Sequence, residues 1–174
     1  MRIIYISFNI LFIFLAGCAD SHQLIKLNSV ASVKLNESGS VYVAVPTDGA
    51  YGSINYHGSG INTAQIIQSA FFRKVQHVEV AQKHEKISKA MEYAKNKNFE
   101  YLVVPTILHW EDRATEWSAI PDQVEVKIEI IELSSGRTIV SGIAKGKSGI
   151  ATLGGDHPQD LLPKPIEEFV TSLY

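Results

Sequence analysis

Cysteine is nearly absent from this chain, since Cys18 is the only one among 174 residues. A single thiol excludes an internal disulfide, a metal site built from several thiolates and a redox pair of cysteines. The chain also lacks an excess of positive charge, because 16 lysines and arginines face 18 aspartates and glutamates, for a formal net charge of −2. Without a basic field the chain is a poor binder of nucleic acid, so we expect no nucleic-acid partner.

Long apolar runs are scarce as well, and the longest lies at the amino terminus. Residues 3–15 are almost wholly apolar, follow Arg2 and contain no acidic residue. A helix that crosses a ~30 Å hydrocarbon core needs roughly 20 residues, so this run is short for a membrane span. A basic start followed by a short apolar centre is the layout of a signal peptide, and we assign residues 1–17 to one.

The end of this segment predicts a lipid anchor. Its last residues and the next one, Leu15-Ala16-Gly17-Cys18, resemble the lipobox of bacterial lipoproteins, in which the cysteine thiol receives the lipid. We therefore expect cleavage before Cys18 and membrane attachment through lipid on that residue, with fatty acids such as palmitate; the alternative is a buried free thiol. By analogy with lipoprotein sorting, Ala19 favours the periplasmic leaflet of the outer membrane over the inner membrane, although Asp20 weakens that inference.

The mature chain predicts a single domain of the α/β (α+β) class. We assign residues 18–40 to the lipidated N-terminus and a tether, because their apolar positions follow no regular period, and residues 41–174 to the globular domain. Strands are expected at 41–46, 77–81, 101–105 with a continuation to 110, 124–130 and 137–147, and helices at 62–76, 85–97 and from 165. The order β-α-β-α-β-β-β-α predicts a five-stranded mixed sheet of order 2-1-3-4-5, packed with helices.

Motifs of familiar catalytic chemistry are missing from the sequence. It contains no Gly-x-Ser-x-Gly elbow and no His-Glu-x-x-His pair, and Gly58-Ser59-Gly60 precedes a predicted helix without the lysine of a phosphate-binding loop. Imidazole and carboxylate groups at His109, Glu111, Asp156 and His157 suit zinc and similar ions, but their spacing lends little support to such a site. We expect no cofactor and no metal.

Two stretches are candidates for a binding surface: the Gly- and Tyr-rich loop 47–62, and the block 109–117 with its two tryptophans. The candidate residues are Tyr51, Tyr56, His109, Trp110, Glu111, Asp112, Arg113, Trp117, Asp156 and His157. Exposed tryptophan faces suit a glycan, a peptide or a protein surface. In the structural alternative, Glu111 and Arg113 form ion pairs with each other or across the next strand, and the tyrosines pack the loop down. Both interpretations stay open.

Three blocks of the domain resemble a family of bacterial lipoproteins known only as a domain of unknown function. The blocks are VYVAVP at 41–46 with the pairs DG at 48–49 and YG at 51–52, PTILHWEDRATEWS at 105–118, and GGDHPQDLL at 154–162. The resemblance implies a lipoprotein precursor and no known activity. The order of elements is also similar to that of small α/β domains in the curli secretion channel subunit and in lipoprotein activators of penicillin-binding proteins, a likeness of fold that fixes no activity.

Three functions compete at this stage. The first is a lipid-anchored envelope protein that acts as a non-catalytic binding or assembly module facing the periplasm, with an unidentified envelope protein or the cell wall as its partner. The second is an envelope hydrolase or metal-dependent enzyme that uses the region of His109, Glu111, Asp156 and His157. The third is a structural lipoprotein whose oligomer is the working unit. We favour the first, and a protein that is not an enzyme, because no convergent catalytic motif occurs.

Overall fold

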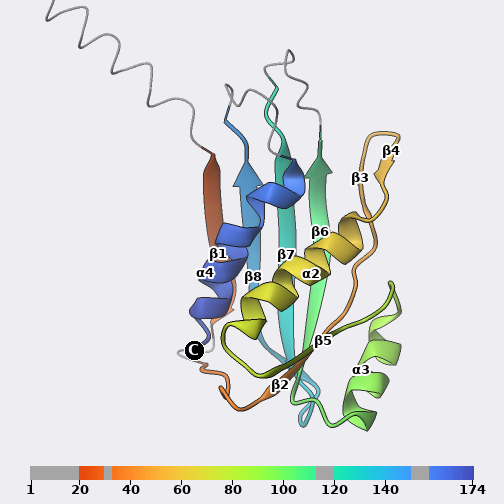
Figure 1. The fold of residues 1–174 in the computed structure, drawn as a ribbon, viewed down its shortest axis with the longest axis vertical. Coiled ribbons are helices and arrows are strands. Elements are labelled where there is room, and N and C mark those ends of the chain that lie inside the picture. Colours follow the sequence, from red (N-terminus) through yellow and green to blue (C-terminus); the bar gives the residue numbers. More distant parts are fainter. Residues whose placement is uncertain (1–19, 30–32, 113–119, 150–156) are drawn as a thin grey trace, which may run out of the picture.

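The computed structural model describes residues 20–29, 33–112, 120–149 and 157–174. The elements are β1 (Ser21–Ser29), β2 (Ser40–Val43), β3 (Gly49–Tyr51), β4 (Ile54–Tyr56), α2 (Ser59–Phe72), β5 (His77–Val80), α3 (Ile87–Asn96), β6 (Tyr101–Glu111), β7 (Gln123–Glu132), β8 (Arg137–Lys147), η2 (Pro158–Leu161) and α4 (Pro163–Thr171). Six strands form one sheet of order β1-β8-β7-β6-β2-β5, and β3 and β4 form a separate hairpin (Figure 1). None of the helices in the described ranges is long and apolar enough to span a membrane.

The predicted fold class is confirmed, and the predicted order of five strands recurs as β5-β2-β6-β7-β8. Strand β2 pairs in parallel with both β5 and β6, because the connections through α2 and α3 return the chain to the same end of the sheet. Strands β6, β7 and β8 then form the predicted antiparallel meander. The strand count differs, since the sheet has six strands rather than five.

The sixth strand comes from residues 18–40, which the sequence pattern assigned to a tether. Strand β1 pairs antiparallel with β8 along its whole length, with a bulge just after Lys26. The bulge shifts the alternation of inward and outward side chains, which is why the sequence shows no regular period there. Just before β1, the Asp20 carboxylate accepts a hydrogen bond from the Gly149 backbone N–H at 3.0 Å. Asp20 is therefore already held by the fold.

The core lies between the sheet and the helices α2 and α4, which cover one of its faces (Figure 1). Strand β7 shows the expected alternation, since Val124, Val126, Ile128 and Ile130 are at most 1% exposed and the residues between them are partly exposed. Burying a side chain of this size contributes about 1.5–3 kcal/mol. The alternation of β7 therefore fixes which face of the sheet receives the helices.

Helix α3 packs on the opposite face, and it covers only the part formed by β2 and β6. Tyr42 of β2 points to that side, with its ring 5.0 Å from the Tyr93 ring of α3 and 5.5 Å from the Phe99 ring. Ala90 and Ala94 of α3 are fully buried. Within the described ranges, no helix packs on this side of β7, β8 and β1. Half of the sheet is therefore left uncovered there.

The predicted loop 47–62 contains the β3–β4 hairpin and the start of α2. The helix begins at Ser59 rather than at residue 62, because the Asp48 carboxylate accepts hydrogen bonds from the backbone N–H groups of Gly58 (3.2 Å) and Gly60 (2.8 Å). A Cβ at Gly60 would lie 2.4 Å from a backbone carbonyl oxygen, so only glycine fits there. Gly60 therefore serves the start of the helix.

Candidate functional site

The uncovered part of the sheet carries two rows of polar side chains. The first row holds Ser21 of β1, Lys147 of β8, Gln123 of β7 and Glu111 of β6, and the second holds Gln23, Lys145, Glu125 and His109 of the same strands. Residues opposite each other in neighbouring strands point to the same side of a sheet, so all eight side chains stand on the side away from α2 and α4. We call these eight residues the polar face.

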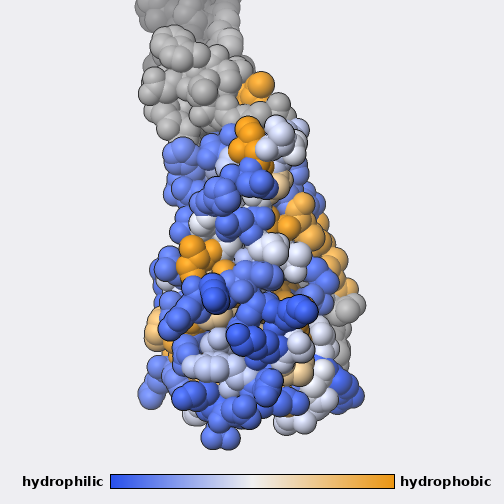
Figure 2. Space-filling view, turned by 90° about the vertical axis from the view of Figure 1, so that its right-hand side faces the viewer, coloured by the Kyte–Doolittle hydropathy of each residue, from blue (hydrophilic) through white to orange (hydrophobic). Residues whose placement is uncertain are grey.

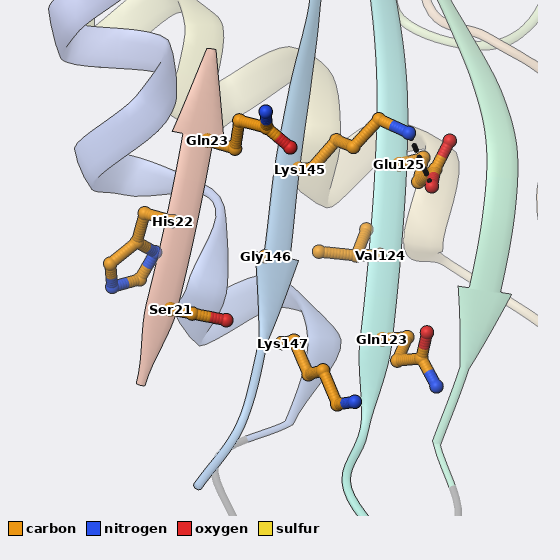
Figure 3. A pocket seen from close by; sticks show the side chains of 9 residues that line it. All are labelled: Ser21, His22, Gln23, Gln123, Val124, Glu125, Lys145, Gly146 and Lys147. Atoms are coloured by element: carbon orange, nitrogen blue, oxygen red, sulfur yellow. Dashed lines mark hydrogen bonds and ion pairs between the residues drawn. The ribbon is translucent and has the colours of Figure 1, made fainter. Parts of the chain in front are cut away.

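A shallow groove of about 270 Å³ lies on the polar face, over β1, β8 and β7 (Figure 3). Lys145 crosses from β8 to β7, where its Nζ donates to Glu125 Oε1 at 2.8 Å. Gln23 lies on the other side of Lys145, on β1, and Lys147 and Gln123 stand one row further along (Figure 3). An open groove with mixed charges suits contact with another protein surface better than enclosure of a small molecule.

At the β6 side of the polar face, His109 and Glu111 form a close pair. His109 Nε2 lies 2.9 Å from Glu111 Oε2, and the two side chains are 33% and 5% exposed. The Tyr51 ring of the hairpin meets the His109 ring edge-on, with their centroids 5.4 Å apart. A carboxylate this far from water requires polar partners, because an uncompensated buried charge is costly. The structure thus brings together three residues that the sequence put forward.

Asp112, the residue after Glu111, forms a second pair with a histidine. His157 Nδ1 lies 3.3 Å from Asp112 Oδ2, in a partly exposed position. The Tyr56 hydroxyl joins the hairpin to this point, because it donates to the Asp112 carbonyl and accepts from the Asp112 N–H, both at 3.3 Å. Tyr56, Asp112 and His157 therefore lie next to one another, just after the last residue of β6.

Trp110 lies in the core, and not on the surface where the binding hypothesis needed it. The residue is 2% exposed, and a Cβ at Gly49 of the hairpin would lie 2.5 Å from the Trp110 Cβ. A bulge between Ile107 and His109 shifts the alternation of β6, so that Trp110 turns to the helix side. Four other candidates, Cys18, Arg113, Trp117 and Asp156, lie outside the described residues.

The histidine and carboxylate side chains at the end of β6 form pairs. Within the described ranges, no cluster of three or more His, Cys, Asp and Glu side chains could hold a metal ion. Among the residues that the structure describes, the side-chain hydrogen bonds of His109 and His157 go to carboxylates. What the two pairs can do is compensate the charges of Glu111 and Asp112 and hold the end of β6 in place.

A second hollow, of about 290 Å³, lies between β2, β5 and α3. There the Tyr42 hydroxyl donates to Glu85 Oε1 at 3.2 Å, and the Tyr93 hydroxyl donates to Glu79 Oε1 at 2.7 Å. Burial raises the pKa of Tyr42, and the Glu85 carboxylate raises it further. The hydrogen bond to Glu79 raises the pKa of Tyr93. Both phenols therefore stay protonated at neutral pH and act as donors rather than as bases.

Sequence reasoning missed the half of the polar face that β1 and β8 supply. Lys145 and Lys147 alternate with small residues in a predicted strand, and this alternation indicates a solvent-exposed face of the sheet. Ser21 and Gln23 gave no such sign, because their segment does not show a strand pattern. Only the pairing of β1 with β8 puts them beside the two lysines.

Comparison with known proteins identifies a family and a shared fold. A family model described as a domain of unknown function, DUF4823, matches residues 33–173. The PelC dodecamer from Paraburkholderia phytofirmans is similar in structure, with a TM-score of 0.65 and 16% identity over 88% of this chain and 96% of that chain. A single-residue variant of PelC gives a TM-score of 0.67 at 16% identity, over 88% of this chain and 98% of that chain.

Protein XCC0632 from Xanthomonas campestris, of the family DUF330, is similar with a TM-score of 0.50 and 14% identity, over 86% of this chain and 87% of that chain. At such identities these likenesses concern the fold alone. No curated protein sequence matches the chain. The DUF4823 model, in contrast, spans every strand of the sheet except β1. The chain therefore belongs to the family described as the domain of unknown function DUF4823.

Proposed function

We propose that this chain is a lipid-anchored protein of the bacterial envelope that works as a non-catalytic assembly module, and that its partner is a further copy of itself. The polar face carries this proposal, because a flat sheet surface of mixed charge with an open groove resembles a protein interface more than an enzyme pocket. The proposal unites the binding-module hypothesis with the oligomer hypothesis.

The envelope location rests on the amino terminus. Residues 1–17 have the layout of a signal peptide, and Leu15-Ala16-Gly17-Cys18 has the layout of a lipobox. With lipid on Cys18 the domain needs no basic surface to stay on a membrane, in line with the formal net charge of −2. Ala19 after the cysteine supports the periplasmic leaflet of the outer membrane as the destination.

The oligomer is supported by the distribution of charge on the polar face. On the β8 side stand Lys145 and Lys147, with the uncharged side chains of Ser21 and Gln23 of β1 beyond them, while on the β7 and β6 side stand Glu125 and the buried Glu111. Lys147 of one copy can therefore meet the partly exposed Glu125 of the next, which already pairs with Lys145 of its own chain, in a head-to-tail contact of the kind that closes rings. PelC, which shares the fold over nearly its whole length, is a dodecamer.

The enzyme hypothesis has less support from the same residues. His109 pairs with the Glu111 carboxylate and His157 with the Asp112 carboxylate, contacts that suit ion pairs holding the end of β6. The open groove lies over β1, β8 and β7, and His109 and His157 are not among the residues that line it. An acid–base site would need both imidazoles to face a space that holds the substrate.

Mass spectrometry of the protein purified from bacterial membranes tests the anchor. We expect a mature chain that begins at a lipidated Cys18, while Cys18→Ala should leave an unlipidated precursor that keeps residues 1–17. A wild-type chain without lipid, or lipid on the variant, would contradict the proposed anchor.

Light scattering of the lipidated protein in mild detergent tests the assembly. We expect a multiple of the protomer mass for the wild type and dissociation by Lys147→Glu, which removes a positive charge from the first row of the polar face. Lys95→Glu makes the same exchange at an exposed position of α3, away from the polar face, and should leave the mass unchanged. A monomeric wild type refutes self-assembly, and a different envelope protein in the complex assigns the polar face to that partner instead.

A further inference from the structure

The start of the fold leaves almost no free chain between the expected lipid and the domain. Strand β1 begins at Ser21, and the Asp20 carboxylate is held by the Gly149 N–H at 3.0 Å. An extended chain spans at most about 3.6 Å per residue, so Cys18 lies within ~7 Å of Asp20 along the backbone. Lipid on Cys18 therefore keeps the domain close to the membrane by one particular end.

That end of the domain is defined by the pairing of the strands. The start of β1 lies beside the last residue of β8, the first residue of β7 and the last residue of β6. Figure 1 shows this end at the top, together with the β3–β4 hairpin. We call it the anchor end. The opposite end carries the turn between β7 and β8 and the carboxyl terminus of the chain (Figure 1).

Ile120 lies two residues before Asp122, which is hydrogen-bonded to Ser148 just after β8 at the anchor end. The Asp122 N–H donates to Ser148 Oγ at 2.8 Å, and the Ser148 N–H donates to the Asp122 carbonyl at 3.0 Å. The neighbour of Ser148 is Gly149, which holds Asp20. Ile120 is nevertheless 44% exposed, although it is a large apolar residue.

Ile54 is the second exposed apolar side chain of the anchor end. It follows the tight turn of the β3–β4 hairpin and is 54% exposed. The base of the hairpin is fixed to the end of β6 through the Tyr56 hydroxyl, which bonds both the N–H and the carbonyl of Asp112. The hairpin therefore holds Ile54 in a defined position instead of letting it pack against the core.

On the face that Figure 2 shows, the two ends of the domain differ in polarity. The turn between β7 and β8 exposes Ser134, Ser135 and Arg137, and the hydrophilic colour dominates the lower end of the molecule in Figure 2. The same view shows hydrophobic residues at the upper end. The 11 residues of β8 join the two ends, and at ~3.4 Å per residue they separate them by about 35 Å.

We infer that the anchor end lies flat against the lipid bilayer and that Ile54 and Ile120 enter its interfacial layer beside the acyl chains on Cys18. The inference rests on the proposed lipidation of Cys18 and adds an orientation and a lipid-contact surface to it. The carboxylates of Asp20, Asp48 and Asp112 lie at or near this end, so the contact suits zwitterionic phospholipids rather than anionic ones. In this orientation the strands stand roughly upright on the membrane and the polar face points sideways.

Fluorescence quenching by the bilayer tests this orientation. Because lipid occupies Cys18, a cysteine introduced by Ser53→Cys in the hairpin turn is the only free thiol, and Ser135→Cys gives the matched control at the opposite end. Both serines are exposed, so each variant should fold like the wild type. Each lipidated full-length variant is labelled with a polarity-sensitive dye and placed in phosphatidylcholine vesicles that contain phospholipid spin-labelled near the headgroup.

We expect the dye at position 53 to lose at least half of its emission to the spin label and the dye at position 135 to lose almost none. Adding Ile54→Ser to the Ser53→Cys protein should weaken the quenching while the lipid on Cys18 remains. Equal quenching at both positions, or stronger quenching at position 135, would overturn the orientation. Mass spectrometry of the same samples separates the two proposals, because absence of lipid on Cys18 refutes the anchor itself, whereas lipid without quenching at position 53 refutes only the orientation.

Discussion

Replacing Gly49 by alanine should loosen the β3–β4 hairpin from β6 and lower the stability of the whole domain. A Cβ at this position would lie 2.5 Å from the Trp110 Cβ and 2.8 Å from its Cγ, much closer than van der Waals contact permits. Trp110 cannot move aside easily, since it is 2% exposed and fixed in the core. Overpacking of this kind costs about 1–3 kcal/mol.

Part of that cost is offset, because alanine restricts the unfolded chain more than glycine does, by about 0.4–1 kcal/mol. We therefore expect a net loss of about 1–2 kcal/mol in the free energy of unfolding. For a domain of this size, 1 kcal/mol lowers Tm by roughly 2–4 °C, so the variant should melt roughly 2–8 °C lower. Gly49→Val, which adds two further carbons at the same place, should lose more.

Urea unfolding followed by tryptophan fluorescence measures this effect, with Trp110 as an internal reporter beside the altered contact. Ser53→Ala, at an exposed position of the same hairpin, is the matched control and should unfold at the wild-type urea concentration. If Gly49→Ala unfolds at the same urea concentration as Ser53→Ala, the hairpin does not pack against Trp110 as described.

Three further perturbations probe other parts of the domain. Asp48→Ala removes the carboxylate that binds two N–H groups at the start of α2 and should cost about 0.5–2 kcal/mol in urea unfolding; a loss as large in Asp48→Asn, which keeps an oxygen acceptor, would argue against this cap. Glu111→Ala should destabilise more than Glu125→Ala, because Glu111 is 5% exposed whereas the Glu125–Lys145 pair is about one-third exposed and worth under ~1 kcal/mol; equal losses would contradict it. Burial raises the pKa of Tyr101 from 10.0 to about 12, so its stabilising effect is complete below pH 10 and is lost as the pH rises to about 12. Tyr101→Phe should therefore flatten the decline of the unfolding free energy over that interval, and an unchanged decline would refute the assignment.

The order of β5, β2, β6, β7 and β8 could be predicted from the sequence because each of these strands has a recognisable residue pattern. In β7 the apolar and charged residues alternate without interruption, and in β2 a short apolar run ends at Pro46. The two helical crossovers then leave few ways to arrange the strands. Strand β1 escaped prediction for a physical reason, since it is an edge strand with a bulge after Lys26 and its pairing depends on β8, more than 100 residues away.

The sequence predicted which residues of the candidate site share a side of β6, but not which of the two sides is buried. The alternation of strand residues put His109 and Glu111 on one side and Trp110 on the other, and the structure agrees. The sequence could not tell which side is buried, because a bulge before His109 decides it. The tryptophan that looked like a binding surface is therefore core, and the histidine and glutamate border the open face.

The proposed lipid attachment at Cys18 bears on what the polar face can do. A lipoprotein on a long tether tumbles freely, so two copies must lose rotational freedom in three dimensions before their surfaces meet. Here the chain joins the sheet at Asp20, and in the proposed orientation every copy on the membrane stands the same way up. The polar faces then point sideways at a common height, so Lys147 of one copy can reach Glu125 of its neighbour by rotation about a single axis. The short link between Cys18 and β1 therefore favours a ring in the plane of the membrane over aggregates that grow in other directions, because only contacts compatible with a shared upright direction can form.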